Sequence, residues 1–265
     1  MPTAHVNGID IYYEEYGAGD PVLLIPGLGG VGLGWGPQIP LFAKQFRTIV
    51  VDHRGVGKSS QPETGYTIAQ HASDMANLLR SLAATPAHIV GVSTGGAIGQ
   101  VMSLEQAKTV RSLVLVASWA RADARFRHLF EIRKDVLCRL GRRRPCSWPC
   151  SLYSPAYYHA HAEQLQLFAS QINAHPPDTS IAVKRIEMIL AHDVLDRLEN
   201  ISSPTCIVVG DQDVVTPAYF SEELKQHIAH RELHVISGAG HSVHAEKPEA
   251  FFAIVRDFIE RLTAC

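Results

Sequence analysis

The stretch that decides the fold is Ile89-Val90-Gly91-Val92-Ser93-Thr94-Gly95-Gly96, in which a short apolar run leads into a serine between glycines. It matches the pattern G-x-S-x-G, in which the serine occupies a strained turn between a strand and a helix. Glycine is needed two positions before and after Ser93, because a Cβ atom there would clash with the neighbouring backbone. A glycine-serine loop with no catalytic role can match the same pattern. The interpretation of Ser93 as a nucleophile therefore depends on finding catalytic partner residues elsewhere in the chain.

The composition fits one large α/β domain of 265 residues. The net charge of −2 lacks the basic excess that a nucleic-acid partner requires. No apolar run reaches the roughly 18 residues of a membrane helix, so we expect no membrane partner. The first residues lack the basic and apolar regions of a secretory signal, and the five cysteines are an odd number. We therefore expect a cytoplasmic protein with reduced thiols.

Apolar runs and amphipathic segments alternate along the chain. Strands are expected at a hairpin over residues 4–16, which turns at Asn7-Gly8, and at residues 22–25, 46–52, 88–92, 110–117, 205–210 and 232–237. Helices are expected at residues 67–82, 95–104, 217–228 and 251–262. This alternation indicates βαβ units and a parallel sheet.

The character of the sequence changes at Ser118, and no strand-like run follows before Cys206. We expect a helical cap at residues 118–200, inserted between core segments 1–117 and 201–265. Residues 121–144 carry nine basic and three acidic side chains. These charges are either solvated helix faces or a group that attracts an anionic substrate.

The glycine-rich segment after residues 22–25 permits two interpretations. Gly27-Leu28-Gly29-Gly30-Val31-Gly32 matches G-x-G-x-x-G, and Asp52 follows 20 residues after Gly32, as in a dinucleotide-binding unit. Pro26 before the glycines and Pro37 after them oppose a helix that starts at the glycines. The other interpretation is a loop whose backbone amide near Leu28 points at a developing oxyanion.

Candidate partners for Ser93 follow two later strands. A serine nucleophile needs a base within hydrogen-bond reach, and the base needs an orienting carboxylate. Asp211 and Asp213 follow one strand, and His241 follows the last strand in a glycine turn, with His244 three residues later. The chain order Ser…Asp…His is the order expected of an α/β hydrolase.

Together these segments resemble the α/β-hydrolase superfamily over essentially the whole chain. The matching segments are 26–29, 52–59, 91–95, 210–213 with Pro217, and Gly240-His241 with Glu246-Lys247-Pro248. The resemblance implies a mostly parallel eight-stranded sheet flanked by helices, with a helical cap. It is nearest to enol-lactonases, aminoacrylate hydrolases and carboxylesterases.

The resemblance also implies roles for single residues. Ser93 would be the nucleophile, His241 its base and Asp213 the partner of the base. The family's spacing from Gly210 selects Asp213 over Asp211. The backbone N–H groups of Leu28 and Thr94 would form the oxyanion hole.

The expected activity is hydrolysis of a small carboxylic ester, lactone or related acyl compound through an acyl-enzyme, with neither a cofactor nor a metal. The same triad serves C–C bond hydrolases, thioesterases and perhydrolases, so these three activities remain alternatives. Two alternatives belong to other classes: an NAD(P)- or FAD-dependent oxidoreductase, and a binding protein of the same fold without catalysis. The oligomeric state is not predicted.

Overall fold

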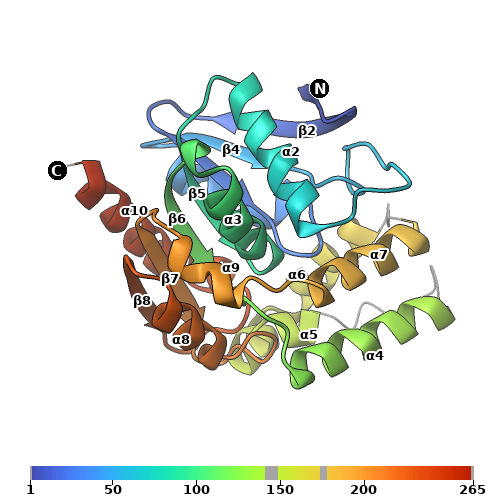
Figure 1. The fold of residues 1–265 in the computed structure, drawn as a ribbon. Helices are drawn as coiled ribbons and strands as arrows, with labels where there is room; N and C mark the ends of the chain where they lie inside the picture. Colours follow the sequence, from blue (N-terminus) through green and yellow to red (C-terminus); the bar gives the residue numbers. More distant parts are fainter. Residues whose placement is uncertain (1, 141–148, 174–177, 264–265) are drawn as a thin grey trace.

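The computed structural model describes residues 2–140, 149–173 and 178–263 (Figure 1). At its centre is an eight-stranded sheet in the order β1-β2-β4-β3-β5-β6-β7-β8. The strands are β1 (Thr3–Val6), β2 (Ile9–Tyr16), β3 (Pro21–Ile25), β4 (Arg47–Val51), β5 (Ala87–Val92), β6 (Val110–Val116), β7 (Thr205–Gly210) and β8 (Arg231–Ile236). Pairing is antiparallel from β1 to β2 and from β2 to β4, and parallel from β4 onwards. The predicted fold class is therefore confirmed.

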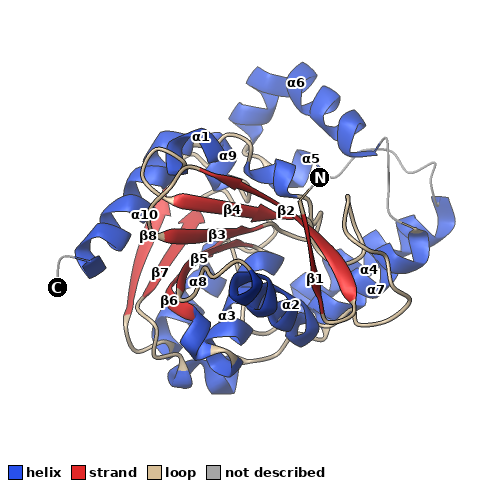
Figure 2. Cartoon of the chain, turned by 90° about the horizontal axis from the view of Figure 1, so that it is seen from above, coloured by secondary structure: helices blue, strands red, loops and turns tan. Residues whose placement is uncertain are grey.

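Helices cover both faces of this sheet (Figure 2). On one face lie α2 (Ile68–Ser81), α3 (Thr94–Glu105) and α8 (Ala218–His227). On the other lie α1 (Ile39–Phe42), α9 (Val243–Glu246) and α10 (Pro248–Thr263). The short helices α1 and α9 are additions to the elements expected from the sequence.

The central strands β3 to β7 are mainly apolar because successive side chains enter different cores. On β6, Leu113 and Leu115 belong to the core beneath α2 and α3, whereas Val114 and Val116 belong to the core beneath α10. All four side chains are fully buried. A strand buried on both faces has no polar side, which accounts for the continuous apolar runs in the sequence.

The described residues between β6 and β7 form a helical insertion, which we define as residues 118–200. It contains α4 (Ala124–Leu140), α5 (Pro149–Leu152), α6 (Pro155–Asn173), α7 (Thr179–Leu190) and a final 3-10 helix (Leu195–Asn200). Helices α4 and α7 pack side by side, and α6 lies apart from this pair (Figure 2). Arg142, Arg143 and Arg144 of the basic segment lie outside the described residues.

Candidate active site

Ser93 occupies a strained turn between β5 and α3. Its backbone has φ 55° and ψ −115°, a region that a residue with a side chain rarely adopts. The Ser93 amide donates to the carbonyl of Val116 at 2.8 Å, which fixes the turn against β6. At Gly95 an added Cβ would lie 2.2 Å from the carbonyl oxygen of Ile25, so only glycine fits there.

Asp213 and His241 meet beyond the carboxyl ends of β7 and β8. His241 Nδ1 lies 2.8 Å from Asp213 Oδ2, and both residues are 5% exposed. The other carboxylate oxygen of Asp213 accepts the amides of Val215 at 2.8 Å and Thr216 at 2.9 Å. The carboxylate is thus fixed, and its partner Nδ1 carries the ring proton. Nε2 of the neutral ring is left as an acceptor.

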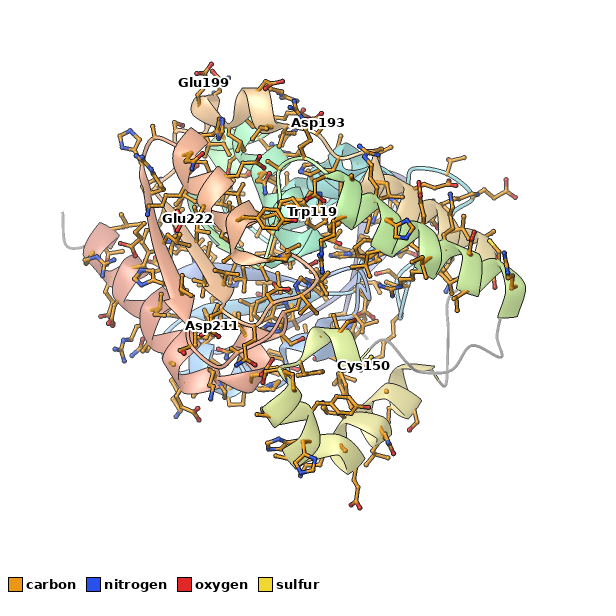
Figure 3. All side chains as sticks on the ribbon, turned by 90° about the horizontal axis from the view of Figure 1, so that it is seen from below. Trp119, Cys150, Asp193, Glu199, Asp211 and Glu222 are labelled. Atoms are coloured by element: carbon orange, nitrogen blue, oxygen red, sulfur yellow. The ribbon has the colours of Figure 1, made fainter. Side chains whose placement is uncertain are left out.

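The two neighbouring candidates have other partners. Asp211, which is labelled in Figure 3, is exposed and accepts the Ser237 hydroxyl at 2.8 Å and the Gly238 amide at 2.7 Å. The hydrogen bond from Ser237 lowers the pKa of Asp211. His244 is buried on α9 against the ring of Trp35, with centroids 4.6 Å apart, and burial lowers its pKa to about 4. Asp213, and not Asp211, is therefore the carboxylate beside His241.

Ser93 and His241 line one cavity of about 700 Å³, between the sheet and the helical insertion. The contacts of the described residues include no hydrogen bond between the Ser93 hydroxyl and His241. In ligand-free enzymes such bonds are often long and tighten only when substrate binds.

Two backbone amides near Ser93 are available to a ligand. Leu28 lies in the loop after β3 and lines the cavity. Thr94 is the first residue of α3, so its amide has no acceptor within the helix. The hydrogen bonds of the described residues include none donated by either amide.

Comparison with known proteins decides the family. A family model described as "alpha/beta hydrolase fold" matches residues 20–248. The chain belongs to the α/β-hydrolase family. A relative named putative carbamate hydrolase RutD, from Azorhizobium caulinodans, is 35% identical over 259 residues, which cover 97% of this chain and 98% of the relative.

Solved structures of similar fold include two enzymes whose names refer to lactones. The enol-lactonase of Burkholderia xenovorans has a TM-score of 0.89 and 25% identity, over 98% of this chain and 100% of that one. Est816, described as an N-acyl homoserine lactone degrading enzyme, has a TM-score of 0.86 and 27% identity, over 97% and 100% of the two chains. This protein is therefore an enzyme of the α/β-hydrolase type. Over residues 2–140, 149–173 and 178–263, every helix is too short or too polar to cross a bilayer.

The glycine-rich loop of this α/β hydrolase does not run into a long helix. After Gly32 come a single 3-10 turn (Gly32–Trp35) and the four residues of α1. The dinucleotide pattern requires a helix whose N-terminus receives the pyrophosphate. The structure places short turns there instead.

Glu246, for which the sequence pattern predicts no role, joins the helical insertion to the loop of His241. Its buried carboxylate accepts the Gly240 amide at 2.8 Å, the Ser154 amide at 3.0 Å and the Ser154 hydroxyl at 2.6 Å. Ser154 immediately precedes α6, and Gly240 immediately precedes His241. Glu246 belongs to the Glu246-Lys247-Pro248 segment that matches the family. Nothing in the sequence, however, predicts that it contacts the distant Ser154.

One group of metal-ligand side chains lies away from the cavity. Among the residues that the structure describes, Cys206 on β7 and Glu232 and His234 on β8 have ligand atoms within 4.8 Å of one another. Arg261 donates to both oxygens of Glu232 at 2.8 Å, so this carboxylate already has a cationic partner. None of the three lines the cavity of Ser93.

Arg121 and Arg125, two arginines of residues 121–144, have partners and do not line the cavity. Arg121 donates to Asp193 at 2.8 Å and to Asp196 at 2.6 Å. The guanidinium of Arg125 donates to the carbonyl of Val214 at 2.5 Å. Arg133 lines the cavity.

Proposed function

We propose that this α/β hydrolase cleaves a carboxylic ester, lactone or related acyl compound through an acyl-enzyme formed on Ser93. The observation that carries the proposal is the 2.8 Å hydrogen bond between His241 and Asp213 beside the cavity that Ser93 also lines. A buried carboxylate on Nδ1 leaves Nε2 free to take the proton of a serine hydroxyl.

The reaction proceeds in two halves. Ser93 Oγ attacks the carbonyl carbon while His241 Nε2 takes its proton, and Asp213 stabilises the imidazolium. The amides of Leu28 and Thr94 donate to the oxyanion, each contributing about 3–4 kcal/mol by comparison with other hydrolases. The alcohol leaves with the proton from His241. Water, activated by the same ring, then releases the acid and restores Ser93.

The helical insertion acts as the cap and determines the substrate. The cavity volume of about 700 Å³ is that of a site for a drug-sized molecule. The side chains from the insertion that line it are mainly apolar, and they include Leu129, Phe130, Ile132, Val136, Leu137, Leu165, Phe168 and Ile186. Substrates with an apolar acyl or alcohol part fill such a cavity best.

Among the described arginines of residues 121–144, Arg133 is the one that would attract an anionic substrate. Arg133 lines the cavity, whereas Arg121 and Arg125 do not. Replacing Arg133 with Gln raises the Michaelis constant for an anionic ester and leaves that of the matched neutral ester unchanged. If the Michaelis constants of both esters change equally, the protein has no preference for an anionic substrate at Arg133.

A carbamate is the second candidate substrate, because the 35% identical relative is named a putative carbamate hydrolase. The triad chemistry is the same, with attack on the carbamate carbonyl giving a carbamoyl-enzyme on Ser93. Hydrolysis rates for the acetate ester and the N-methylcarbamate of one alcohol separate the two candidates. Substrates of thioesterases, C–C bond hydrolases and perhydrolases should be assayed beside these two.

Fluorophosphonate labelling and an ester assay test the proposal. We expect labelling at Ser93, and loss of both labelling and hydrolysis in Ser93→Ala. The control is Ser170→Ala, which changes an exposed serine of α6. Full esterase activity in Ser93→Ala contradicts the proposal, and an unlabelled wild-type protein supports a binding protein instead. Saturable NAD(P)H binding indicates the oxidoreductase alternative.

A further inference from the structure

Arg185, on α7, is a buried guanidinium beneath the cavity. Its side chain is 2% exposed. Nη1 donates to the Arg54 carbonyl at 2.9 Å and lies 3.2 Å from His71 Nε2. Nη2 donates to the Leu28 carbonyl at 2.8 Å and lies 3.2 Å from His53 Nδ1. Four acceptors therefore surround the two terminal nitrogens.

The acceptors around Arg185 are neutral. Burial lowers the pKa of His53 well below its ordinary value and the pKa of His71 to about 3. His71 Nδ1 lies 2.9 Å from the Thr67 carbonyl, so it carries the proton and leaves Nε2 to accept from Arg185. Burial also lowers the pKa of Arg185, to about 10, so the guanidinium is charged at neutral pH.

No carboxylate of a described residue forms an ion pair with Arg185. The nearby Asp74 is engaged by Arg54, at 2.8 and 2.9 Å. A buried charge is costly unless other groups compensate it. Carbonyl and imidazole dipoles supply part of that compensation here, and the positive charge is left next to the cavity that Arg185 lines.

The contact with Leu28 connects Arg185 to the oxyanion loop. The carbonyl to which the guanidinium donates belongs to Leu28, which lines the cavity and whose amide is the proposed oxyanion donor. Gly30, two residues later, has φ +75°, and a Cβ built on it would lie 2.6 Å from Arg185 Nη2. The guanidinium thus lies directly against two positions of the loop. Both terminal nitrogens of the guanidinium donate to protein acceptors. Arg185 is therefore not available to bind a substrate carboxylate through two parallel hydrogen bonds.

We propose that Arg185 is a positioning residue of the reaction. It holds the loop of residues 27–30 so that the Leu28 amide points at the oxyanion, and its charge favours the anion over the neutral carbonyl. This inference rests on the proposed function, since it requires an oxyanion at Ser93. Its effect falls on the transition state and spares substrate binding, because the neutral substrate carries no such charge.

The test compares Arg185→Met and Arg185→Lys with Lys184→Met. Lys184, the adjacent residue of α7, donates to the Glu63 carbonyl at the surface and provides the matched control. For a neutral ester we expect kcat to fall by roughly 10- to 100-fold in Arg185→Met, with KM within about twofold. Phenylboronic acid, which forms a tetrahedral adduct with serine, should lose affinity by a similar factor. Arg185→Lys should recover part of both losses, because it keeps the charge.

Circular dichroism and thermal unfolding establish that each variant is folded at the assay temperature. A folded Arg185→Met enzyme with unchanged kcat and boronate affinity overturns the inference. A rise in KM alone also overturns it, by assigning Arg185 to substrate binding. If Arg185→Met does not fold, Arg185→Lys and Arg185→Gln decide by the same two measurements. Failure of the proposed function is distinct, because boronate then does not inhibit the wild-type enzyme and Ser93→Ala stays active.

Discussion

The amide of Gly32 donates a 2.8 Å hydrogen bond to the carboxylate of Asp52, 20 residues further along the chain. The second oxygen of Asp52 accepts the Lys58 amide, also at 2.8 Å. Asp52 thereby joins the glycine-rich loop after β3 to the turn after β4. The spacing that imitates a dinucleotide site serves here to fix the loop that carries Leu28.

Asp52→Asn should weaken catalysis through this loop. An amide in place of the carboxylate turns its NH₂ group towards one of the two backbone donors, so at least one hydrogen bond is lost. We expect a cost of about 1–3 kcal/mol in stability and a lower kcat. Urea unfolding and ester kinetics measure the two effects. The exposed Asp10, changed to Asn, is the control; equal behaviour of the two variants contradicts the role of Asp52.

Asp213→Asn should lower kcat by on the order of 10³- to 10⁴-fold, because an amide no longer holds His241 in the required tautomer. Asp211→Asn, two residues away, should change kcat by less than about twofold, since Asp211 only fixes the turn at Gly238. Steady-state kinetics on one ester measures both. If Asp211→Asn were the inactive variant, the pairing of Asp213 with His241 would not be the functional one.

Glu246→Gln should destabilise the protein and misplace His241. The neutral side chain loses at least one of the bonds from Gly240 and Ser154, and hydrogen bonds to a charged acceptor are each worth about 1.5–3 kcal/mol. We expect a loss of about 2 kcal/mol by urea unfolding, together with a lower kcat. Glu249→Gln, at an exposed position in the first turn of α10, is the control; it should leave kcat unchanged and cost no more than about 0.3–1 kcal/mol, the contribution of an acid at a helix N-terminus.

Buried histidines should make the fold sensitive to acid. Burial, aided by the charge of Arg111, lowers the pKa of His88 to about 4. A histidine whose folded pKa lies below its unfolded value of about 6.5 binds more protons when unfolded, so stability is fully present above pH 6.5 and declines as the pH falls towards 4. His88 alone accounts for about 2 kcal/mol of the loss between pH 7 and pH 5.

The measurement is the difference in urea-unfolding free energy between pH 7 and pH 5. His88→Gln keeps a partner for Ser112, which lies 2.8 Å from His88 Nδ1, and it cannot titrate. Its pH 5 penalty should be smaller than that of the wild type by about 2 kcal/mol. His227→Gln, at an exposed position, should leave the penalty unchanged. An undiminished penalty in His88→Gln assigns the acid sensitivity to other groups.

Local signals explain how closely the core elements were predicted. The expected helix over residues 67–82 is observed as α2, because the side chain of Thr67 caps its first turn by accepting the Gln70 amide at 3.0 Å. The hairpin turns at Asn7 and Gly8, both with positive φ, as the type I′ turn requires. The buried strands follow directly from their uninterrupted apolar runs.

Contacts between distant segments explain what was missed. The surroundings of Arg185 come from residues 28, 53, 54 and 71, more than one hundred positions earlier in the chain. A signal did exist: Ile181, Arg185 and Ile189 share one face of α7, so the arginine lies on an apolar face. The helical pattern predicts that the Arg185 guanidinium is buried, but it does not predict which residues contact it. The roles of Ser93, Asp213 and His241 remain the predictions that the proposed experiments test.

The helical insertion interrupts the core in the order of synthesis as well as in space. A ribosome that has produced residues 1–117 has made the segments of the serine turn and the glycine-rich loop, but neither Asp213 nor His241. Asp213 follows only after the insertion and β7, and His241 only after β8 as well. If Ser93 acts as proposed, a nascent chain therefore carries it without its acid and base until His241 has been made. Hydrolysis of a fluorogenic ester during cell-free synthesis would report completion of the whole fold and not of its first half.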